Sequence, residues 1–91
     1  MFDHGISRPR LRELLEQVME PYSRKTRAEM KCLLTNGPIL GEGIDDGRPY
    51  WTKILVLEDT LDYIHISFEI SAEDGSSFYP VSFDEIYREP D

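Results

Sequence analysis

The sequence predicts an α+β domain, in which one N-terminal helix packs on one face of an antiparallel sheet of three to five strands. Residues 63–71 alternate apolar and polar side chains, which is the period-2 pattern of a strand with one face in a core. Residues 11–19 instead carry apolar side chains at the spacing of an amphipathic helix. The 91 residues suit a single small domain.

The helix is expected to begin after Ser7, whose hydroxyl can cap the first turn, and to end at Pro21. Pro9 suits the first turn, where its missing N–H is not needed. The apolar stripe that would cover the sheet consists of Leu11, Leu14, Leu15, Val18 and Met19. Residues 1–6 are expected to form a loose arm, and residues 89–91 a tail.

Residues 22–35 fit two structures. As a helix capped by Ser23 they carry a weak apolar stripe, and as a strand over residues 28–34 they alternate. We favour the strand because Asn36-Gly37, a strong turn signal, follows it directly. Cys32 is the single cysteine, which excludes an intramolecular disulfide, and we expect it to be buried.

Residues 38–49 contain three glycines and two prolines, which predicts a mobile loop with at most a short strand at residues 39–40. A turn is expected at Asp45-Asp46-Gly47.

Two apolar runs then predict a β-hairpin. Residues 50–57 are apolar at both alternating sets, which is typical of a strand covered on both faces, and five polar and acidic residues separate this run from residues 63–71. After a loop at residues 72–77, residues 78–83 predict a third strand, which Pro80 places at the edge of the sheet because proline cannot donate to a ladder. Residues 83–88 fit either its continuation or one helical turn.

Charge is distributed unevenly along the chain, whose net charge is −8. Residues 1–35 hold seven Lys or Arg and five acids, a net of +2, whereas residues 36–91 hold three and thirteen, a net of −10. This asymmetry favours a partner with a basic surface, or pairing with a second copy, and argues against nucleic-acid binding by the whole surface. Phosphate contact is a minor hypothesis for the basic cluster Arg8, Arg10, Arg12, Arg24, Lys25 and Arg27.

The chain is expected to be cytoplasmic and to have no membrane partner. No apolar run approaches the roughly 18 residues that span a bilayer. The first ten residues also lack the apolar stretch of a signal peptide.

No catalytic, cofactor or metal site is predicted. The acidic loops offer carboxylates, but their spacing differs from that of a calcium-binding EF-hand loop. Gly41-Glu42-Gly43 lacks the third glycine and the following helix of a dinucleotide loop. His65 has no evident nucleophile beside it.

The sequence favours a non-enzymatic protein-interaction domain, either an inhibitor- or immunity-type protein or a homodimer. The predicted surface is a tyrosine-bearing sheet face with an acidic rim, made of Tyr50, Tyr63, His65, Tyr79, Glu58, Asp59 and Asp62. The alternative is a small-molecule-binding domain or minor enzyme, with a pocket between residues 38–49 and the sheet that Tyr50, Trp51 and His65 would line.

Overall fold

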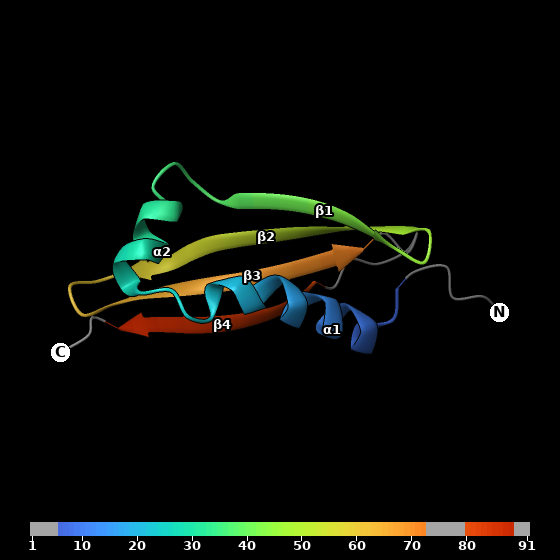
Figure 1. The fold of residues 1–91 in the computed structure, drawn as a ribbon, viewed down its shortest axis with the longest axis horizontal. Coiled ribbons are helices and arrows are strands. Elements are labelled where there is room, and N and C mark those ends of the chain that lie inside the picture. The colour runs from blue at the N-terminus through green and yellow to red at the C-terminus, as the bar shows by residue number, and fades with distance from the viewer. Residues whose placement is uncertain (1–5, 73–79, 89–91) are drawn as a thin grey trace.

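The computed structural model describes residues 6–72 and 80–88 and confirms the α+β class (Figure 1). Two helices precede a four-stranded antiparallel sheet whose spatial order equals its chain order, β1-β2-β3-β4. The elements are α1 (Arg8–Met19), η1 (Glu20–Tyr22), α2 (Arg27–Leu33), β1 (Ile39–Asp45), β2 (Arg48–Asp59), β3 (Tyr63–Ala72) and β4 (Val81–Arg88). No helix in these ranges is long and apolar enough to cross a membrane.

Helix α1 forms as the sequence predicts. The Ser7 hydroxyl accepts from the Arg10 N–H at 3.3 Å, which caps the helix. Leu11, Leu14 and Leu15 are buried against the sheet. Pro21 lies in the 3-10 turn η1 that follows directly, so the α-helix ends at Met19.

The strand expected over residues 28–34 is wrong, because this segment is helix α2. Thr26 rather than Ser23 caps it, in a reciprocal capping box: its hydroxyl accepts from the Glu29 N–H, and the Glu29 carboxylate accepts from the Thr26 N–H. The hydrogen bond from the Thr26 N–H is the main reason that the pKa of Glu29 lies below its ordinary value. Met30 is the buried residue of this short helix, and Cys32 is exposed, against expectation.

The loop expected over residues 38–49 is largely the edge strand β1. Opposite Gly41 and Gly43 stand Thr52 and Tyr50 of β2, whose side chains fill the space that a Cβ at either glycine would need. The predicted turn is confirmed: Asp46 and Gly47 have φ of 52° and 79°, as in a two-residue type I′ hairpin turn.

The hairpin β2–β3 is confirmed, with a bulge at Leu57 where the register shifts between Val56 and Glu58. The prediction that this first strand of the hairpin is covered on both faces is wrong: Ile54 is the one buried residue of β2, and Trp51, Val56 and Leu57 are exposed. Strand β3 alternates as predicted, with Ile64, Ile66, Phe68 and Ile70 in the core.

Strand β4 extends to Arg88, so residues 83–88 continue a strand and do not form a helical turn. It is the second edge of the sheet, as predicted, but Pro80 directly precedes the strand and does not lie within it. The start of the predicted strand at residues 78–79 lies outside the described residues, as does most of the preceding loop.

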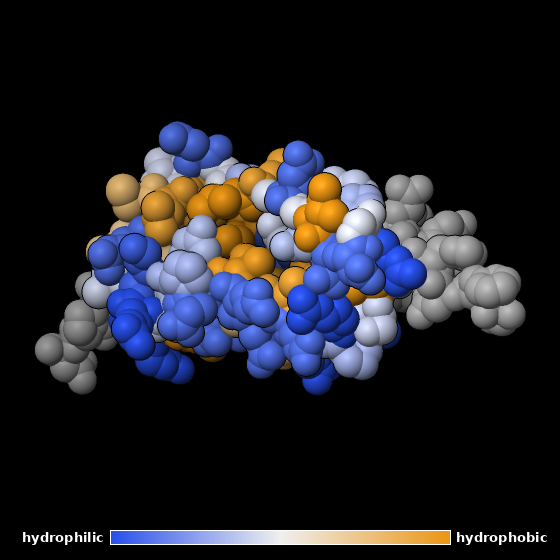
Figure 2. All heavy atoms as spheres, turned by 45° about the vertical axis from the view of Figure 1, so that its right-hand side comes forward, coloured by the Kyte–Doolittle hydropathy of each residue, from blue (hydrophilic) through white to orange (hydrophobic). Residues whose placement is uncertain are grey.

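Both helices lie on the same face of the sheet, which we call the helix face (Figure 1). They pack chiefly against β3 and β4. Apolar side chains remain visible beside the hydrophilic outer surface of α1, toward the β1 and β2 side of the molecule (Figure 2). The opposite side, the open face, carries no helix in the described part of the chain.

Side-chain contacts between the helical layer and the sheet include an ion pair of Arg10 and a hydrogen bond of Tyr87. Arg10 grips both carboxylate oxygens of Asp45, at 3.1 and 2.9 Å, which raises its own pKa and holds that of Asp45 below its ordinary value. The Tyr87 hydroxyl donates to the Tyr22 carbonyl at 3.1 Å, and burial, with a smaller contribution from Glu85, raises the pKa of Tyr87 to about 12.

Candidate interaction surface on the open face

Strand alternation and the observed register determine which side chains share the open face. The helix face carries the buried side chains of β3, which are Ile64, Ile66, Phe68 and Ile70, and the residues paired with them on β2 and β4. The residues that alternate with these along each strand point to the open face. The open face comprises Leu40, Glu42, Ile44, Pro49, Trp51, Lys53, Leu55, Glu58, Tyr63, His65, Ser67, Glu69, Ser71, Ser82, Asp84, Ile86 and Arg88.

An apolar region occupies the β1–β2 side of the open face. Leu40 and Ile44 of β1 are 73% and 74% exposed, and Trp51 of β2 is 40% exposed. Half-buried Leu55 and exposed Pro49 extend the region along β2. Isolated exposed leucines are common on protein surfaces, but adjoining apolar side chains on one face are typical of interaction sites.

A polar region occupies the β3–β4 side. His65 Nε2 lies 3.3 Å from a carboxylate oxygen of Asp84. Ser67 is only 3% exposed, because it is a small residue between Leu55 and Asp84 on the neighbouring strands, and its hydroxyl donates to Glu69 at 3.5 Å. The serine therefore bonds to a carboxylate rather than to His65, and the region is an electrostatic cluster around a buried hydroxyl.

Tyr63 ends the polar region near the β2–β3 turn. Its hydroxyl donates to Glu58 Oε1 at 2.7 Å, and this hydrogen bond is the main reason that its pKa lies above its ordinary value. The Arg88 guanidinium lies 5.8 Å from the centre of the tyrosine ring. These contacts fix one aromatic side chain between an acid and a base.

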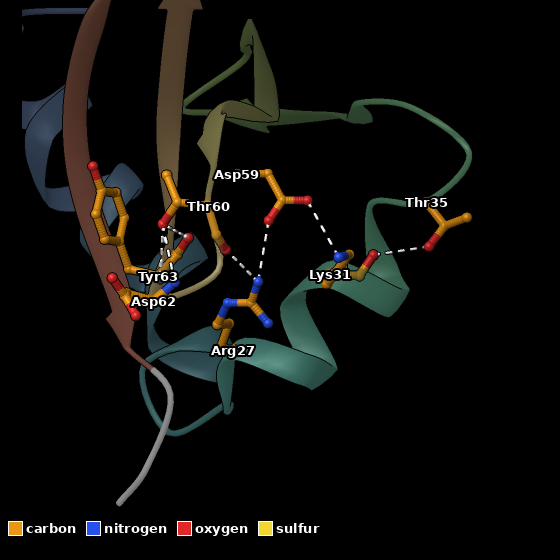
Figure 3. A network of polar contacts seen from close by, with 7 residues as sticks. All are labelled: Arg27, Lys31, Thr35, Asp59, Thr60, Asp62 and Tyr63. Carbon is orange, nitrogen blue, oxygen red and sulfur yellow. Dashed lines mark hydrogen bonds and ion pairs between the residues drawn. The ribbon is translucent and has the colours of Figure 1, made fainter.

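Asp59 is committed to contacts within the chain, as Figure 3 shows. It lies 3.3 Å from Arg27 and 3.5 Å from Lys31, both on α2. Arg27 also donates to the Thr60 carbonyl in the β2–β3 turn. This network ties α2 to the end of the hairpin and leaves Asp59 a structural role.

The turn at residues 60–63 is stabilised locally. The Thr60 hydroxyl accepts from the Asp62 and Tyr63 N–H groups at 3.2 and 3.1 Å, and the Thr60 N–H donates to the Tyr63 carbonyl at 2.9 Å (Figure 3). Asp62 itself is exposed at the tip.

The structure brings together only part of the predicted surface. Glu58, Tyr63 and His65 do share the open face. Tyr50 does not, because it pairs with Ala72 and its half-buried ring packs over Gly43 on the helix face. Tyr79 lies outside the described residues.

Leu40 and Ile44, the two most exposed apolar residues of the face, are absent from the predicted surface, and Trp51 is predicted only in a pocket wall. Leu40 and Ile44 stand in a segment whose glycines and prolines predict a loop, and Trp51 stands in a strand that the pattern predicts to be covered on both faces. The available signal was the alternation of Leu40, Glu42 and Ile44, which becomes visible once residues 39–45 are read as a strand.

The wall proposed for a small-molecule pocket is assembled only in part. Residues 39–45 belong to the sheet rather than lying over it. Tyr50 and Trp51 both line one depression at the β1–β2 end of the sheet, although their side chains alternate to opposite faces, whereas His65 does not line it. In the described residues, no three His, Cys, Asp or Glu side chains gather where they could hold a metal ion.

The basic cluster proposed for phosphate contact is dispersed. Arg10 binds Asp45 and also Glu13 at 3.1 Å, and the Arg12 guanidinium lies 5.6 Å from the centre of the Phe83 ring. Arg27 belongs to the network around Asp59. Members of the cluster therefore serve different contacts inside the fold.

In comparisons with known proteins, no family model, curated protein or solved structure matches this chain.

Proposed function

We propose that this chain is a non-enzymatic protein-interaction domain whose open face binds a partner with a basic surface. The observation that carries the proposal is the uncovered apolar region of Leu40, Ile44 and Trp51, which adjoins acidic side chains on the same sheet face. An exposed tryptophan with aliphatic neighbours and a charged surround has the composition of a protein-binding site.

The size of the face suits this role. The four strands contain 37 residues. At about 3.3 Å along a strand and about 4.8 Å between strands, one face covers about 600 Å². A standard interface buries about 800 Å² per partner, so the sheet face could supply most of one.

Charge favours a different, basic protein over a second copy of this chain. The open face carries four acids, Glu42, Glu58, Glu69 and Asp84, against the cations Lys53 and Arg88. Two copies meeting by this face would bring acidic surfaces together on chains that each carry −8. Opposite potentials accelerate association and like potentials suppress it, so a cationic surface is the better complement. An inhibitor- or immunity-type protein is one class that fits.

The test uses three immobilised forms of the full chain: wild type, Ile44→Arg on the open face, and Gln17→Arg on the exposed surface of α1. Both variants add one positive charge at an exposed position, but only Ile44→Arg places it on the open face and removes an apolar side chain there. A cell lysate is passed over each form. We expect wild type and Gln17→Arg to retain the same basic protein from it, and Ile44→Arg not to retain that protein. The captured protein is then identified by mass spectrometry, purified, and titrated against all three forms by calorimetry.

Equal affinity of the purified protein for all three forms would refute the open face as the binding surface. A concentration-dependent doubling of mass by light scattering, abolished by Ile44→Arg, would instead replace the basic partner with a second copy. Capture of nothing by wild type would also count against the proposal.

A further inference from the structure

A depression of about 350 Å³ lies at the β1–β2 end of the sheet. This volume is at the small end of the roughly 300–1,000 Å³ of ligand sites. It is lined by Glu42, Gly43, Ile44, Pro49, Tyr50 and Trp51. Four of these residues belong to the open face, so the depression opens beside the apolar region.

Glu42 and Trp51 are the chemically distinctive pair in this depression. They are direct cross-strand partners in the register of β1 and β2, which places their Cβ atoms about 4.5–5.5 Å apart on the same face. The indole therefore stands beside a carboxylate, with aliphatic Ile44 and Pro49 next to them.

The Glu42 carboxylate forms no ion pair or side-chain hydrogen bond with any residue of 6–72 or 80–88. The nearest cation along the open face is Lys53, which stands opposite Leu40, two positions along the ladder from the Glu42–Trp51 pair. It lies beyond the 4 Å of an ion pair. A carboxylate beside an aromatic ring is thus left available to a cation from outside the chain.

We propose that this depression receives an arginine side chain of the partner. The guanidinium would stack on the Trp51 ring and donate to the Glu42 carboxylate, and its methylene groups would contact Ile44 and Pro49. Arginine suits the site better than lysine because its planar group both stacks on aromatic faces and donates two parallel hydrogen bonds to one carboxylate. This inference rests on the proposed function and specifies which partner group the basic surface must present.

Trp51 makes the site directly observable, since it is the only tryptophan in the chain. The probe is an acetylated and amidated Gly-Arg-Gly peptide, titrated into the full chain at millimolar concentration. The indole N–H signal of Trp51 in NMR spectra and the fluorescence of Trp51 report binding. The matched control peptide replaces arginine with citrulline, which keeps the shape and removes the charge.

We expect the arginine peptide, and not the citrulline peptide, to shift the indole signal. Glu42→Gln should weaken arginine binding by up to about fivefold, the range of exposed ion pairs. Glu16→Gln removes the same charge from the exposed surface of α1 and should leave binding unchanged. Both variants change exposed side chains, and unchanged circular dichroism and thermal midpoints would verify that they fold.

Three results would overturn the inference: an indole signal that does not move, equal binding of the citrulline peptide, or equal weakening by Glu16→Gln and Glu42→Gln. Equal weakening by the two variants would show that the peptide is attracted to the acidic chain as a whole and not to Glu42. If the peptide fails while Ile44→Arg still abolishes capture of the purified partner, the pocket inference alone is wrong. If the peptide binds while capture is insensitive to Ile44→Arg, the proposed function is wrong.

Discussion

Leu15→Ala and Leu40→Ala remove the same atoms from the two sides of the molecule, so together they test whether the open face is bare in solution. Leu15 is 0% exposed between α1 and the sheet, whereas Leu40 is 73% exposed on the open face. Any second layer, whether another subunit or a segment outside the described residues, would bury Leu40 and make the two substitutions alike.

The expected magnitudes differ severalfold. Leu15→Ala should lower the free energy of unfolding by about 3–5 kcal/mol, because it loses the transfer free energy of the removed atoms and leaves a cavity. Leu40→Ala removes three carbons worth about 2.4 kcal/mol when fully buried, and about a quarter of the side chain is covered, so the loss should be about 0.6 kcal/mol.

Urea unfolding followed by circular dichroism measures both losses, provided the slope with denaturant stays constant. Leu15→Met, which conserves volume, should lose less than about 1.5 kcal/mol and serves where the alanine variant is too unstable to fold. A loss above about 2 kcal/mol for Leu40→Ala, whatever the loss for Leu15→Ala, would refute the exposed sheet face. If that loss grows with protein concentration, the layer that covers Leu40 is a second copy of the chain.

Three further predictions concern the contacts that hold the helices. The pKa values of Asp45 and Glu29 are lowered in the folded chain, so each carboxylate stabilises the fold above its unfolded pKa of about 4, and this stability is lost as pH falls through the lower folded value. Asp45→Asn should therefore make stability fall less steeply below about pH 4 in urea unfolding measured at several pH values. An unchanged pH dependence in the acid range would contradict the Arg10 contact. Thr26→Ala removes the cap of α2 and should lower stability by about 0.5–2 kcal/mol in thermal unfolding, with no loss showing that the cap is dispensable. Tyr87→Phe removes the hydroxyl that donates to the Tyr22 carbonyl in η1, so it should lower the free energy of unfolding by about 0.5–1.5 kcal/mol. Absorbance titrations of the variant should also lose a tyrosine that ionises near pH 12. An unaltered titration would mean that Tyr87 is not the tyrosine with the raised pKa.

Local patterns determined the elements whose structure follows from their own residues. Helix α1 has a cap, a proline in its first turn and a complete apolar stripe, so its existence and its buried side follow without knowledge of the rest. Strand β3 alternates strictly and follows an apolar run after a short polar loop, so the hairpin β2–β3 follows as well, and Asp46-Gly47 predicts its own tight turn with positive φ.

The tertiary structure decided what depends on partners distant in sequence. The apolar spacing of residues 27–33 is compatible with helix and strand; the local Thr26–Glu29 capping box favours the helix, and Met30 in the core and the contacts of Arg27 and Lys31 with Asp59 stabilise it. Strand β1 tolerates its glycines because Tyr50 and Thr52 fill the space beside them, which no pattern within residues 39–45 reveals.

The candidate site was the least predictable feature, because it depends on which face each side chain takes. Periodicity shows that residues alternate but not which set a helical layer will cover, and two helices cover only one face of four strands. The register across β2 and β3 then separates Tyr50 from Tyr63, and the register across β1 and β2 brings Trp51 beside Glu42. Residue patterns alone predict the alternating strand β3, the helix that covers its apolar side and the acid-rich C-terminal half; the packing of the helices on one face leaves Trp51 uncovered beside a carboxylate.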